Sequence, residues 1–297
     1  MGGRLMKIFV VDAFTDVIFG GNPAGVVILP EGADFPDDET CVKTAAEMRY
    51  SETAFIKRLG EKEFNIRYFT PAAEVELCGH ATIGSFAALR YGGYIGDGTY
   101  LNHTISGDIY VDVDGDRILM DMAKPVKIGE ITEEDKLEEL YGIMGLDYAA
   151  QKAAGMELLP QMISTGLPDI MMPVKTLKDL DDIAPDFPAL SKLSERYEVV
   201  GVHAFTLEGD DATAHARNFA PLYDIDEEAA TGTSNGALTY YGYLNGFVRS
   251  GDDVKIIQGE KMGRPSAILT HIEADGENCL IRVGGRGIMV LEGEINI

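Results

Sequence analysis

Short apolar runs separated by turns dominate this chain and predict a fold rich in strands. The runs are enriched in Val, Ile, Phe and Tyr and end at Gly, Pro, Asn or Asp, as strands do. Within 63–69, Phe64, Ile66 and Tyr68 share one face, the period of two that a half-buried strand requires. The predicted strands are 7–14, a segment within 20–29, 51–56, 63–69, 109–113, 117–122, 161–165, 169–174, 199–207, 213–219, 254–258, 266–271, 280–283 and 288–291.

Two longer runs of small and apolar residues predict the main helices. One begins at about Gly79 and ends near Gly92, and the other runs from about Gly232 to Leu244. Shorter helices are predicted at 36–48, at 132–141 and within 176–197. Because strands and helices do not alternate regularly, an α+β fold is favoured over a doubly wound parallel sheet. Each half is expected to be a curved, mostly antiparallel sheet around its long helix.

One stretch of sequence occurs twice. Residues 67–89 read RYFTPAAEVELCGHATIGSFAAL, and residues 217–238 read RNFAPLYDIDEEAATGTSNGAL. The matched pairs are Arg67 with Arg217, Phe69 with Phe219, Pro71 with Pro221 and, after about three extra residues, Gly79 with Gly232. We therefore expect two similar halves, 1–127 completed by a strand at about 285–297, and 128–284, with the active site in the cleft between them.

Each copy leads into a predicted helix through a turn of small residues. The first N–H groups of a helix have no partner within it, and they carry partial positive charge. Two such helix starts would suit an anionic substrate. The alternative is that both are ordinary glycine-containing turns between a strand and a helix.

Composition narrows the class of protein. The 297 residues are 45% hydrophobic, enough for one large or two medium domains. The net charge of −24 disfavours nucleic acid and anionic membranes as partners. Three scattered cysteines, Cys41, Cys78 and Cys279, fit a reducing compartment. With no signal-peptide pattern and no apolar run long enough to span a membrane, we expect a cytoplasmic protein.

Glu52 is the first candidate catalytic residue. It precedes the apolar run Ala54-Phe55-Ile56, so burial is expected to raise its pKa and suit it to be a general base. The alternative is an exposed glutamate at a strand edge.

Cys78, Gly79 and His80 mark the start of the first long helix. There the thiol could have a lowered pKa, and the helix dipole is expected to keep the histidine neutral. The alternative is a structural cysteine and a capping histidine. No metal site is expected, because no cluster of Cys and His residues has a metal-binding spacing.

The second copy contains Glu228 and the run Ala230-Thr231-Gly232-Thr233-Ser234. Three hydroxyl side chains and several backbone N–H groups could form an anion nest there, although Ser and Thr are also common helix caps. A further glycine-rich loop, 258–266, reads QGEKMGRPS. It lacks the spacing of a nucleotide-binding loop.

Five motifs in order, GNPAGVV, SETAF, FTP…CGHAT, ATGT and QGEKMGRPS, span nearly the whole chain. Together they resemble the PhzF-like family of phenazine-biosynthesis isomerase-like proteins, within the diaminopimelate epimerase fold. The resemblance implies two pseudo-symmetric α+β domains, a site between them, no metal, no organic cofactor and a homodimer.

The resemblance also implies roles for particular residues. Glu52 matches the glutamate that moves a proton within a cyclic dihydro-hydroxyanthranilate, and His80 matches the family's histidine. Glu228 and Thr233 stand where the family's characterised isomerase has aspartate and serine. Cys78, Gly79, Thr231, Gly232 and Ser234 are the predicted substrate-binding residues. The two departures indicate a substrate other than the phenazine precursor.

The leading interpretation is an isomerase that shifts a proton on a small, cyclic carboxylate. A second is an amino-acid epimerase or racemase. Members of the wider fold use two cysteines for that reaction, but here only Cys78 is a cysteine and Thr231 holds the other place. A third is a binding protein that retains the fold.

Overall fold

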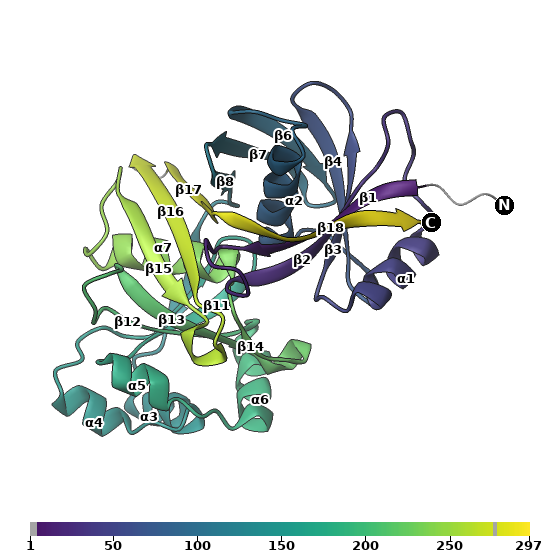
Figure 1. Ribbon diagram of the computed structural model, residues 1–297. Helices are drawn as coiled ribbons and strands as arrows, with labels where there is room; N and C mark the ends of the chain where they lie inside the picture. Colours follow the sequence, from purple (N-terminus) through teal and green to yellow (C-terminus); the bar gives the residue numbers. More distant parts are fainter. Residues whose placement is uncertain (1–4, 276–277) are drawn as a thin grey trace. The chain divides into compact units, whose positions relative to one another are not determined.

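The computed structural model describes residues 5–275 and 278–297 of the chain. These residues form two compact units. Unit 1 consists of the described part of Met1–Asp121 together with Gly284–Ile297, and unit 2 of the described part of Met122–Val283. Each unit combines a mixed sheet with one long helix, α2 in unit 1 and α7 in unit 2 (Figure 1). The predicted α+β class is confirmed.

Unit 1 is built mainly from strands of the N-terminal half of the chain. Its strands are β1 (Leu5–Ala13), β2 (Asn22–Ile28), β3 (Thr53–Arg58), β4 (Glu63–Phe69), β5 (Glu74–Val75), β6 (Gly98–Thr104), β7 (Gly107–Asp114), β8 (Arg117–Asp121) and β18 (Gly287–Asn296). Its helices are α1 (Asp38–Met48) and α2 (Gly79–Tyr91). The C-terminal strand β18 pairs with β1, from Leu5 opposite Asn296 to Ala13 opposite Gly287.

Unit 2 carries additional short helices. Its strands are β9 (Val126–Glu130), β10 (Gln161–Ser164), β11 (Pro168–Pro173), β12 (Gly201–Thr206), β13 (Ala214–Ala220), β14 (Ile225–Glu228), β15 (Asp253–Gln258), β16 (Ser266–Asp275) and β17 (Asn278–Gly285), which ends just past the unit boundary. Its helices are α3 (Glu134–Ile143), α4 (Tyr148–Ala153), α5 (Leu177–Asp182), α6 (Phe187–Tyr197), α7 (Gly232–Leu244) and the 3₁₀ turns η1 (Pro221–Tyr223) and η2 (Glu260–Met262).

The strand pairings repeat from unit 1 to unit 2. In unit 1, β1 and β2 are antiparallel, β2 and β3 parallel, β3 and β4 antiparallel, β4 and β6 parallel, and β6 and β7 antiparallel. In unit 2 the same series runs through β10, β11, β12, β13, β15 and β16. The sequence repeat thus belongs to a repeated fold.

The repeated arginines share two kinds of contact in the two units. Arg67 forms two hydrogen bonds with Glu74, at 2.7 and 2.6 Å, and Arg217 forms two with Glu227, both at 2.8 Å. Each guanidinium also lies 4.9 Å from the ring of the phenylalanine two residues later. Such bidentate pairs fix a strand to the hairpin that follows it. That hairpin leads directly to the long helix of its unit.

The long helices are buried on nearly all sides. In α2 every residue from His80 to Leu89 is buried, which is typical of a helix enclosed by a sheet. Small residues allow close packing: a Cβ placed on Gly84 would lie 3.5 Å from the Cβ atoms of Ala24 and Val11. Buried polar side chains of the helix form hydrogen bonds within it: the hydroxyl of Ser85, for example, donates to the carbonyl of Ala81 at 2.6 Å.

In unit 2, α7 and the group α3–α6 lie on opposite sides of β12 and β13 (Figure 1). The strand residues alternate accordingly. Phe219 packs into the apolar core shared with α3, α5 and α6, whereas the neighbouring Asn218 donates to Ser234 of α7. The α7 side of this sheet therefore carries buried hydrogen bonds between polar side chains.

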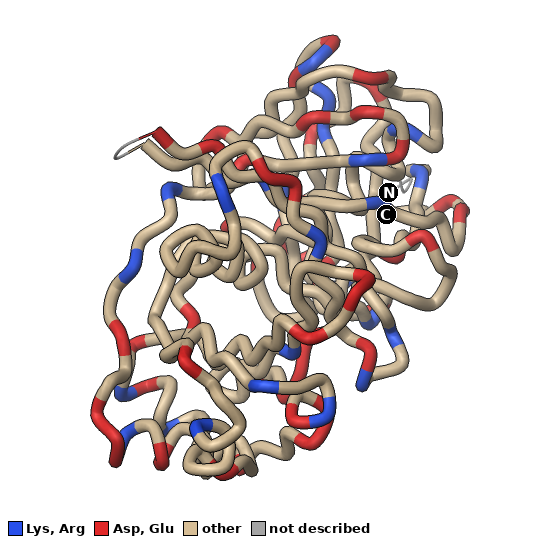
Figure 2. The backbone as a smooth tube through the Cα atoms, turned by 90° about the vertical axis from the view of Figure 1, so that its left-hand side faces the viewer, with Lys and Arg blue, Asp and Glu red and all other residues tan. Residues whose placement is uncertain are grey.

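Acidic residues are distributed over the backbone of both units (Figure 2). No single segment carries the charge of −24. A dispersed charge of this kind is typical of a solvated surface. Among the described residues, every helix is too short or too polar to cross a lipid bilayer.

Candidate active site

The two long helices begin in the same way. Cys78 precedes α2 with φ −139° and ψ 117°, and Thr231 precedes α7 with φ −125° and ψ 103°. Neither side chain accepts a capping hydrogen bond from the first turn. The first residues of the helices are Gly79 and Gly232, as the sequence predicted. Since neither first turn is capped by these side chains, both can offer backbone N–H groups to an anion.

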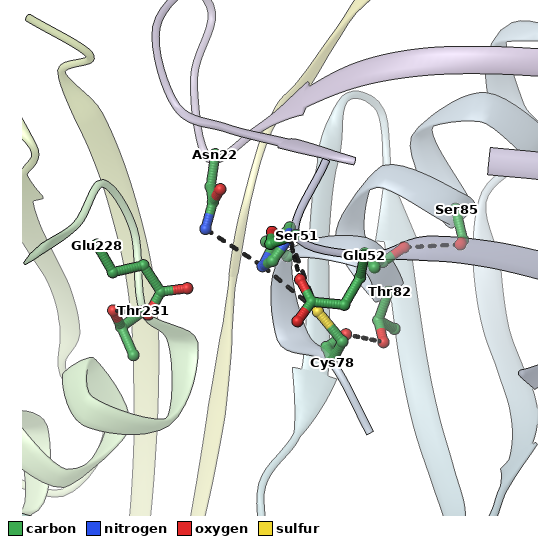
Figure 3. A network of polar contacts seen from close by, with 10 residues as sticks. Asn22, Ser51, Glu52, Cys78, Thr82, Ser85, Glu228 and Thr231 are labelled. Carbon is green, nitrogen blue, oxygen red and sulfur yellow. Dashed lines mark hydrogen bonds and ion pairs between the residues drawn. The ribbon is translucent and has the colours of Figure 1, made fainter. Parts of the chain in front are cut away.

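In unit 1, Glu52 and His80 form an ion pair. The Oε2 atom of Glu52 lies 3.1 Å from Nε2 of His80, and the two side chains are 19% and 5% exposed (Figure 3). Asn22 and Ser51 also contact the imidazole ring, at 3.2 Å from Nδ1 and 3.3 Å from Nε2. Glu52 lies just before β3, and His80 is the second residue of α2, so two rigid elements fix the pair.

The pair is close but not aligned as a hydrogen bond. Oε2 of Glu52 is a buried oxygen that makes no hydrogen bond of normal geometry with the described residues. Catalytic hydrogen bonds are often loose before substrate binds. The ion pair with His80 is therefore the contact that holds this oxygen, and the side chain as a whole stays 19% exposed.

The charge states of Glu52 and His80 differ from those the sequence predicted. Burial favours a raised pKa for Glu52, but contacts with His80, Ser51 and Cys78 outweigh it, and its pKa is lowered. Burial alone would lower the pKa of His80, whereas Cys78 and Glu52 raise it well above its ordinary value. The expectations of a raised Glu52 pKa and a neutral His80 were wrong, because each group stabilises the charge of the other. The lowered pKa of Glu52 and the raised pKa of His80 both favour a carboxylate paired with an imidazolium.

Cys78 packs against the same ring. Its Sγ atom lies 3.4 Å from Nδ1 and 3.8 Å from Nε2 of His80 (Figure 3). Burial raises the pKa of the Cys78 thiol to about 11. The prediction of a lowered pKa was therefore wrong: at this helix start burial outweighs the dipole, and the thiol is protonated at neutral pH.

The same three side chains are of the kinds that bind metal ions. Ligand atoms of Glu52, Cys78 and His80 all lie within 4.8 Å of one another. A carboxylate, a thiol and an imidazole are a donor set that suits zinc. Of the described residues, these are the ones that could hold a metal, a capacity that the sequence did not predict.

In unit 2, Glu228 and Thr231 form the corresponding polar group. The hydroxyl of Thr231 donates to Oε2 of Glu228 at 2.6 Å (Figure 3). Thr233 lies in the first turn of α7, where its carbonyl accepts a hydrogen bond from Thr165 at 2.8 Å. Glu228, Thr231 and Thr233 are all partly exposed, so a ligand can reach them.

Ser234 lies deeper than the sequence suggested. Its side chain is fully buried, and its hydroxyl donates to Oδ2 of Asp169, so it serves the interior of unit 2. Burial raises the pKa of Asp169 to about 6, against the opposite effects of Ser234, Gly201 and Asn218. Sequence reasoning missed Asp169, although a lone acid inside the apolar strand β11 was a usable signal.

Three further polar residues at the two sites were also missed: Asn22, Ser51 and Gln258. Asn22 and Ser51 lie within or beside the GNPAGVV and SETAF motifs, and Gln258 begins the QGEKMGRPS loop. The motifs contained them, but their partners are far away in the sequence.

The comparisons with known proteins agree with this fold. The crystal structure of a Bacillus anthracis phenazine biosynthesis protein of the PhzF family matches with a TM-score of 0.85 and 25% identity, covering 99% of this chain and 100% of that one. A hydroxyproline epimerase from Agrobacterium vitis matches with a TM-score of 0.60 and 13% identity, covering 99% and 92% of the two chains. The second match shows a shared fold alone. Together they confirm the predicted diaminopimelate epimerase-like fold.

Sequence comparison gives the family. An uncharacterized isomerase of Clostridium acetobutylicum is 32% identical over 305 residues, covering 98% of each protein. An uncharacterized isomerase of Bacillus subtilis is 30% identical over 291 residues, covering 95% of this chain and 96% of the relative. The family model described as phenazine biosynthesis-like protein matches residues 11–293. The chain therefore belongs to the PhzC-PhzF family of phenazine biosynthesis-like proteins.

Proposed function

We propose that this protein is an isomerase that moves a proton between two positions of a small, cyclic carboxylate without an organic cofactor. The Glu52–His80 pair carries the proposal. A carboxylate that is held charged beside an imidazole and is partly exposed is equipped to take a proton from carbon. Membership of the family, and relatives named as isomerases, support the reaction class.

In this proposal Glu52 acts first as base and then as acid. It removes a proton from one carbon of the substrate and returns it to another atom of the same conjugated system. The His80 imidazolium, 3.1 Å from the carboxylate, stabilises the charged form of Glu52 before the proton moves. Once Glu52 is protonated, the same imidazolium can stabilise negative charge on the substrate.

The substrate's carboxylate is assigned to the helix starts. The N–H groups of the first turn of α2, beginning with Gly79, bind it or the enolate that develops during proton transfer. The raised pKa of His80 favours a positive charge beside that turn. This local positive charge supports an anionic substrate, even though the chain as a whole carries −24.

Unit 2 supplies a second carboxylate and a second helix start. We assign Glu228 and Thr233 to proton relay or substrate orientation, and the N–H groups from Gly232 to anion binding. Thr231 donates to Glu228 at 2.6 Å, which supports a fixed carboxylate there. That both groups act on one substrate, in a cleft between the halves, stays a prediction from the family resemblance, as does a homodimer.

The substrate itself is expected to differ from the phenazine precursor. Glu228 is one methylene longer than the aspartate of the family's characterised isomerase, and Thr233 has one methyl group more than its serine. The methyl group of Thr233 lies against Gly166, where a Cβ would be 3.8 Å away. Both changes add volume to side chains of unit 2, which supports a smaller or differently substituted ring.

The proposal is tested by NMR in D₂O with a panel of cyclic amino- and hydroxy-carboxylates. Deuterium uptake at a ring carbon, with formation of an isomer of the compound, supports proton-shift isomerisation and identifies the substrate class. Uptake with inversion at a carbon next to the carboxylate would instead indicate an epimerase. Binding without any exchange would indicate a binding protein.

A further inference from the structure

The loop that follows β15 contacts the backbone of Glu228 and its neighbours. Gln258, the last residue of β15, is fully buried. Its Nε2 atom donates to the carbonyl of Glu228 at 2.7 Å and to Oγ1 of Thr231 at 3.2 Å. Its Oε1 atom accepts from the backbone N–H of Thr231 at 3.3 Å and from Nδ2 of Asn235 at 2.6 Å. The side-chain amide of Gln258 thus donates two hydrogen bonds and accepts two, all with residues at this site.

Main-chain partners fix the orientation of this amide. A backbone N–H can only donate and a carbonyl can only accept. Oε1 of Gln258 must therefore face the N–H of Thr231, and Nε2 must face the carbonyl of Glu228. The reversed amide would place two donors together at one end and two acceptors at the other.

The direction of the next hydrogen bond follows. Nε2 of Gln258 donates to the hydroxyl oxygen of Thr231, so this oxygen acts as an acceptor toward Gln258. A threonine hydroxyl has one proton, which is then directed to Oε2 of Glu228, 2.6 Å away. Glu228 is thereby held as a hydrogen-bond acceptor in one orientation.

Asn235 links Gln258 to a further buried residue through hydrogen bonds of defined direction. Its Nδ2 atom donates to the carbonyl of Thr231 at 2.8 Å, which leaves Oδ1 to accept from Nε2 of His203 at 3.2 Å. Burial lowers the pKa of His203 to about 4, so the ring is neutral with its proton on Nε2. Its Nδ1 atom accepts from Asn218 at 3.2 Å. Each hydrogen bond from Gln258 through Asn235 to His203 therefore has one defined donor and one defined acceptor.

Two more residues of the loop hold the same backbone. Ser266 donates to the carbonyl of Ala229 at 2.8 Å. Gly259 has φ +80°, and a Cβ there would lie 2.6 Å from that carbonyl oxygen, closer than any side chain allows. The sequence QGEKMGRPS thus encodes a cradle for residues 228–231 rather than a nucleotide-binding loop.

We propose that Gln258 is a positioning residue for the reaction: it sets the direction of the Thr231 hydroxyl and so fixes the Glu228 carboxylate. This inference rests on the proposed function of Glu228. Gln258 does not touch the substrate in this account. It acts through Thr231, and the Gln258–Ser266 loop keeps the backbone of residues 228–231 in place.

The test compares Gln258→Met with Gln161→Met. Gln161 is equally suitable for this change, since it is 5% exposed in the same unit and bonds to Glu130 and Asn245. Amide hydrogen exchange, measured by NMR without substrate, reports on the N–H of Thr231. We expect it to exchange at least about tenfold faster in Gln258→Met, with the interior of α7 unchanged and Gln161→Met like wild type.

Kinetics with a substrate found in the NMR panel give the second readout. We expect Gln258→Met to lower kcat at least about tenfold with little change in KM, as loss of orientation does. Thr231→Val removes only a partly exposed hydroxyl and should give a similar loss. The double variant should be no worse than either single one, because both changes interrupt one path.

The outcomes separate the two proposals. An unchanged Thr231 amide, or full kcat in Gln258→Met, overturns the positioning role, as does additive loss in the double variant. If Gln258→Met does not fold, Thr231→Val must still show the loss of kcat for the proposal to stand. If the wild-type protein transfers no proton at all, the proposed function fails, and the amide exchange alone decides whether Gln258 fixes this loop.

Discussion

Nε2 of His80 lies 3.1 Å from Oε2 of Glu52, and this contact lowers the pKa of Glu52 and, together with Cys78, raises that of His80. Glu52 immediately precedes β3, and His80 lies in the first turn of α2; both elements belong to unit 1. Each group raises the stability of the other's charged form. The lowered pKa of Glu52 favours the charged form that the proposed role as a base requires.

The pair predicts how activity depends on pH. A contact that raises the pKa of His80 favours its charged form, so the imidazolium persists above the ordinary value and is lost only at higher pH. We expect kcat/KM to remain high through neutral pH and to fall on the alkaline side. His80→Gln should lower kcat/KM at neutral pH by at least about 100-fold and abolish this alkaline fall. A pH profile of the wild type that falls at the ordinary histidine pKa would contradict the pairing.

Cys78 is predicted to be dispensable for chemistry. Its thiol is buried and protonated, since its pKa is raised to about 11. Cys78→Ser should retain activity within about tenfold, as expected of a packing change rather than loss of a base. Cys41→Ser is the matched control, because Cys41 is also buried in unit 1 with a pKa raised to about 12. Loss of all activity in Cys78→Ser alone would favour a cysteine-based racemase.

Asp169 is predicted to make stability depend on pH. Burial raises its pKa from 3.8 to about 6, so the folded chain binds this proton more tightly than the unfolded chain. The contribution of Asp169 to stability is present below pH 3.8 and is lost as the pH rises toward 6. From about pH 4 to pH 7 this amounts to about 2 kcal/mol.

Asp169→Asn tests that prediction. Urea unfolding at both pH values gives the free energies of wild type and variant. The advantage of wild type over Asp169→Asn should be larger at the lower pH by about 2 kcal/mol. An equal difference at both pH values would show that Asp169 titrates as an ordinary acid.

Unit 2 is predicted to take part in the same reaction. Glu228→Gln keeps the size of the side chain but removes the charge that accepts from Thr231. We expect kcat to fall at least about tenfold for the substrate that depends on Glu52. Glu139→Gln is the control, since Glu139 is 42% exposed in α3 of the same unit and pairs with Arg196 at 2.7 Å. Full activity in Glu228→Gln would confine the chemistry to unit 1.

Local patterns in the sequence predicted the elements that position the site. The helix starts at Gly79 and Gly232 agree with the structure, because a small-residue turn before an apolar run is a local signal. Strands β5, β6, β9 and β14 and helix α4 were not predicted. The segment 98–104, GTYLNHT, lacks clear alternation, and β6 forms by pairing with β4 and β7, which adjacent residues do not reveal.

The contacts within the site were less predictable than its residues. Motifs pointed to Glu52 and His80, but the direction of each pKa depends on their contact, which only the fold brings about. The acceptor of Ser234 is Asp169, 65 positions away in the sequence. No local pattern reveals such a partner, and the hydroxyl therefore looked like a substrate ligand.

The most direct test of the account is the rate at which the substrate's carbon exchanges its proton with D₂O. It is measured for wild type, Glu52→Gln and Glu63→Gln. Glu63 also pairs with a histidine, His103, at 2.7 Å in unit 1, but outside the site. We expect Glu52→Gln to lose at least about 100-fold in rate, while Glu63→Gln exchanges like wild type. Undiminished exchange in Glu52→Gln would contradict the assignment of Glu52 as the base.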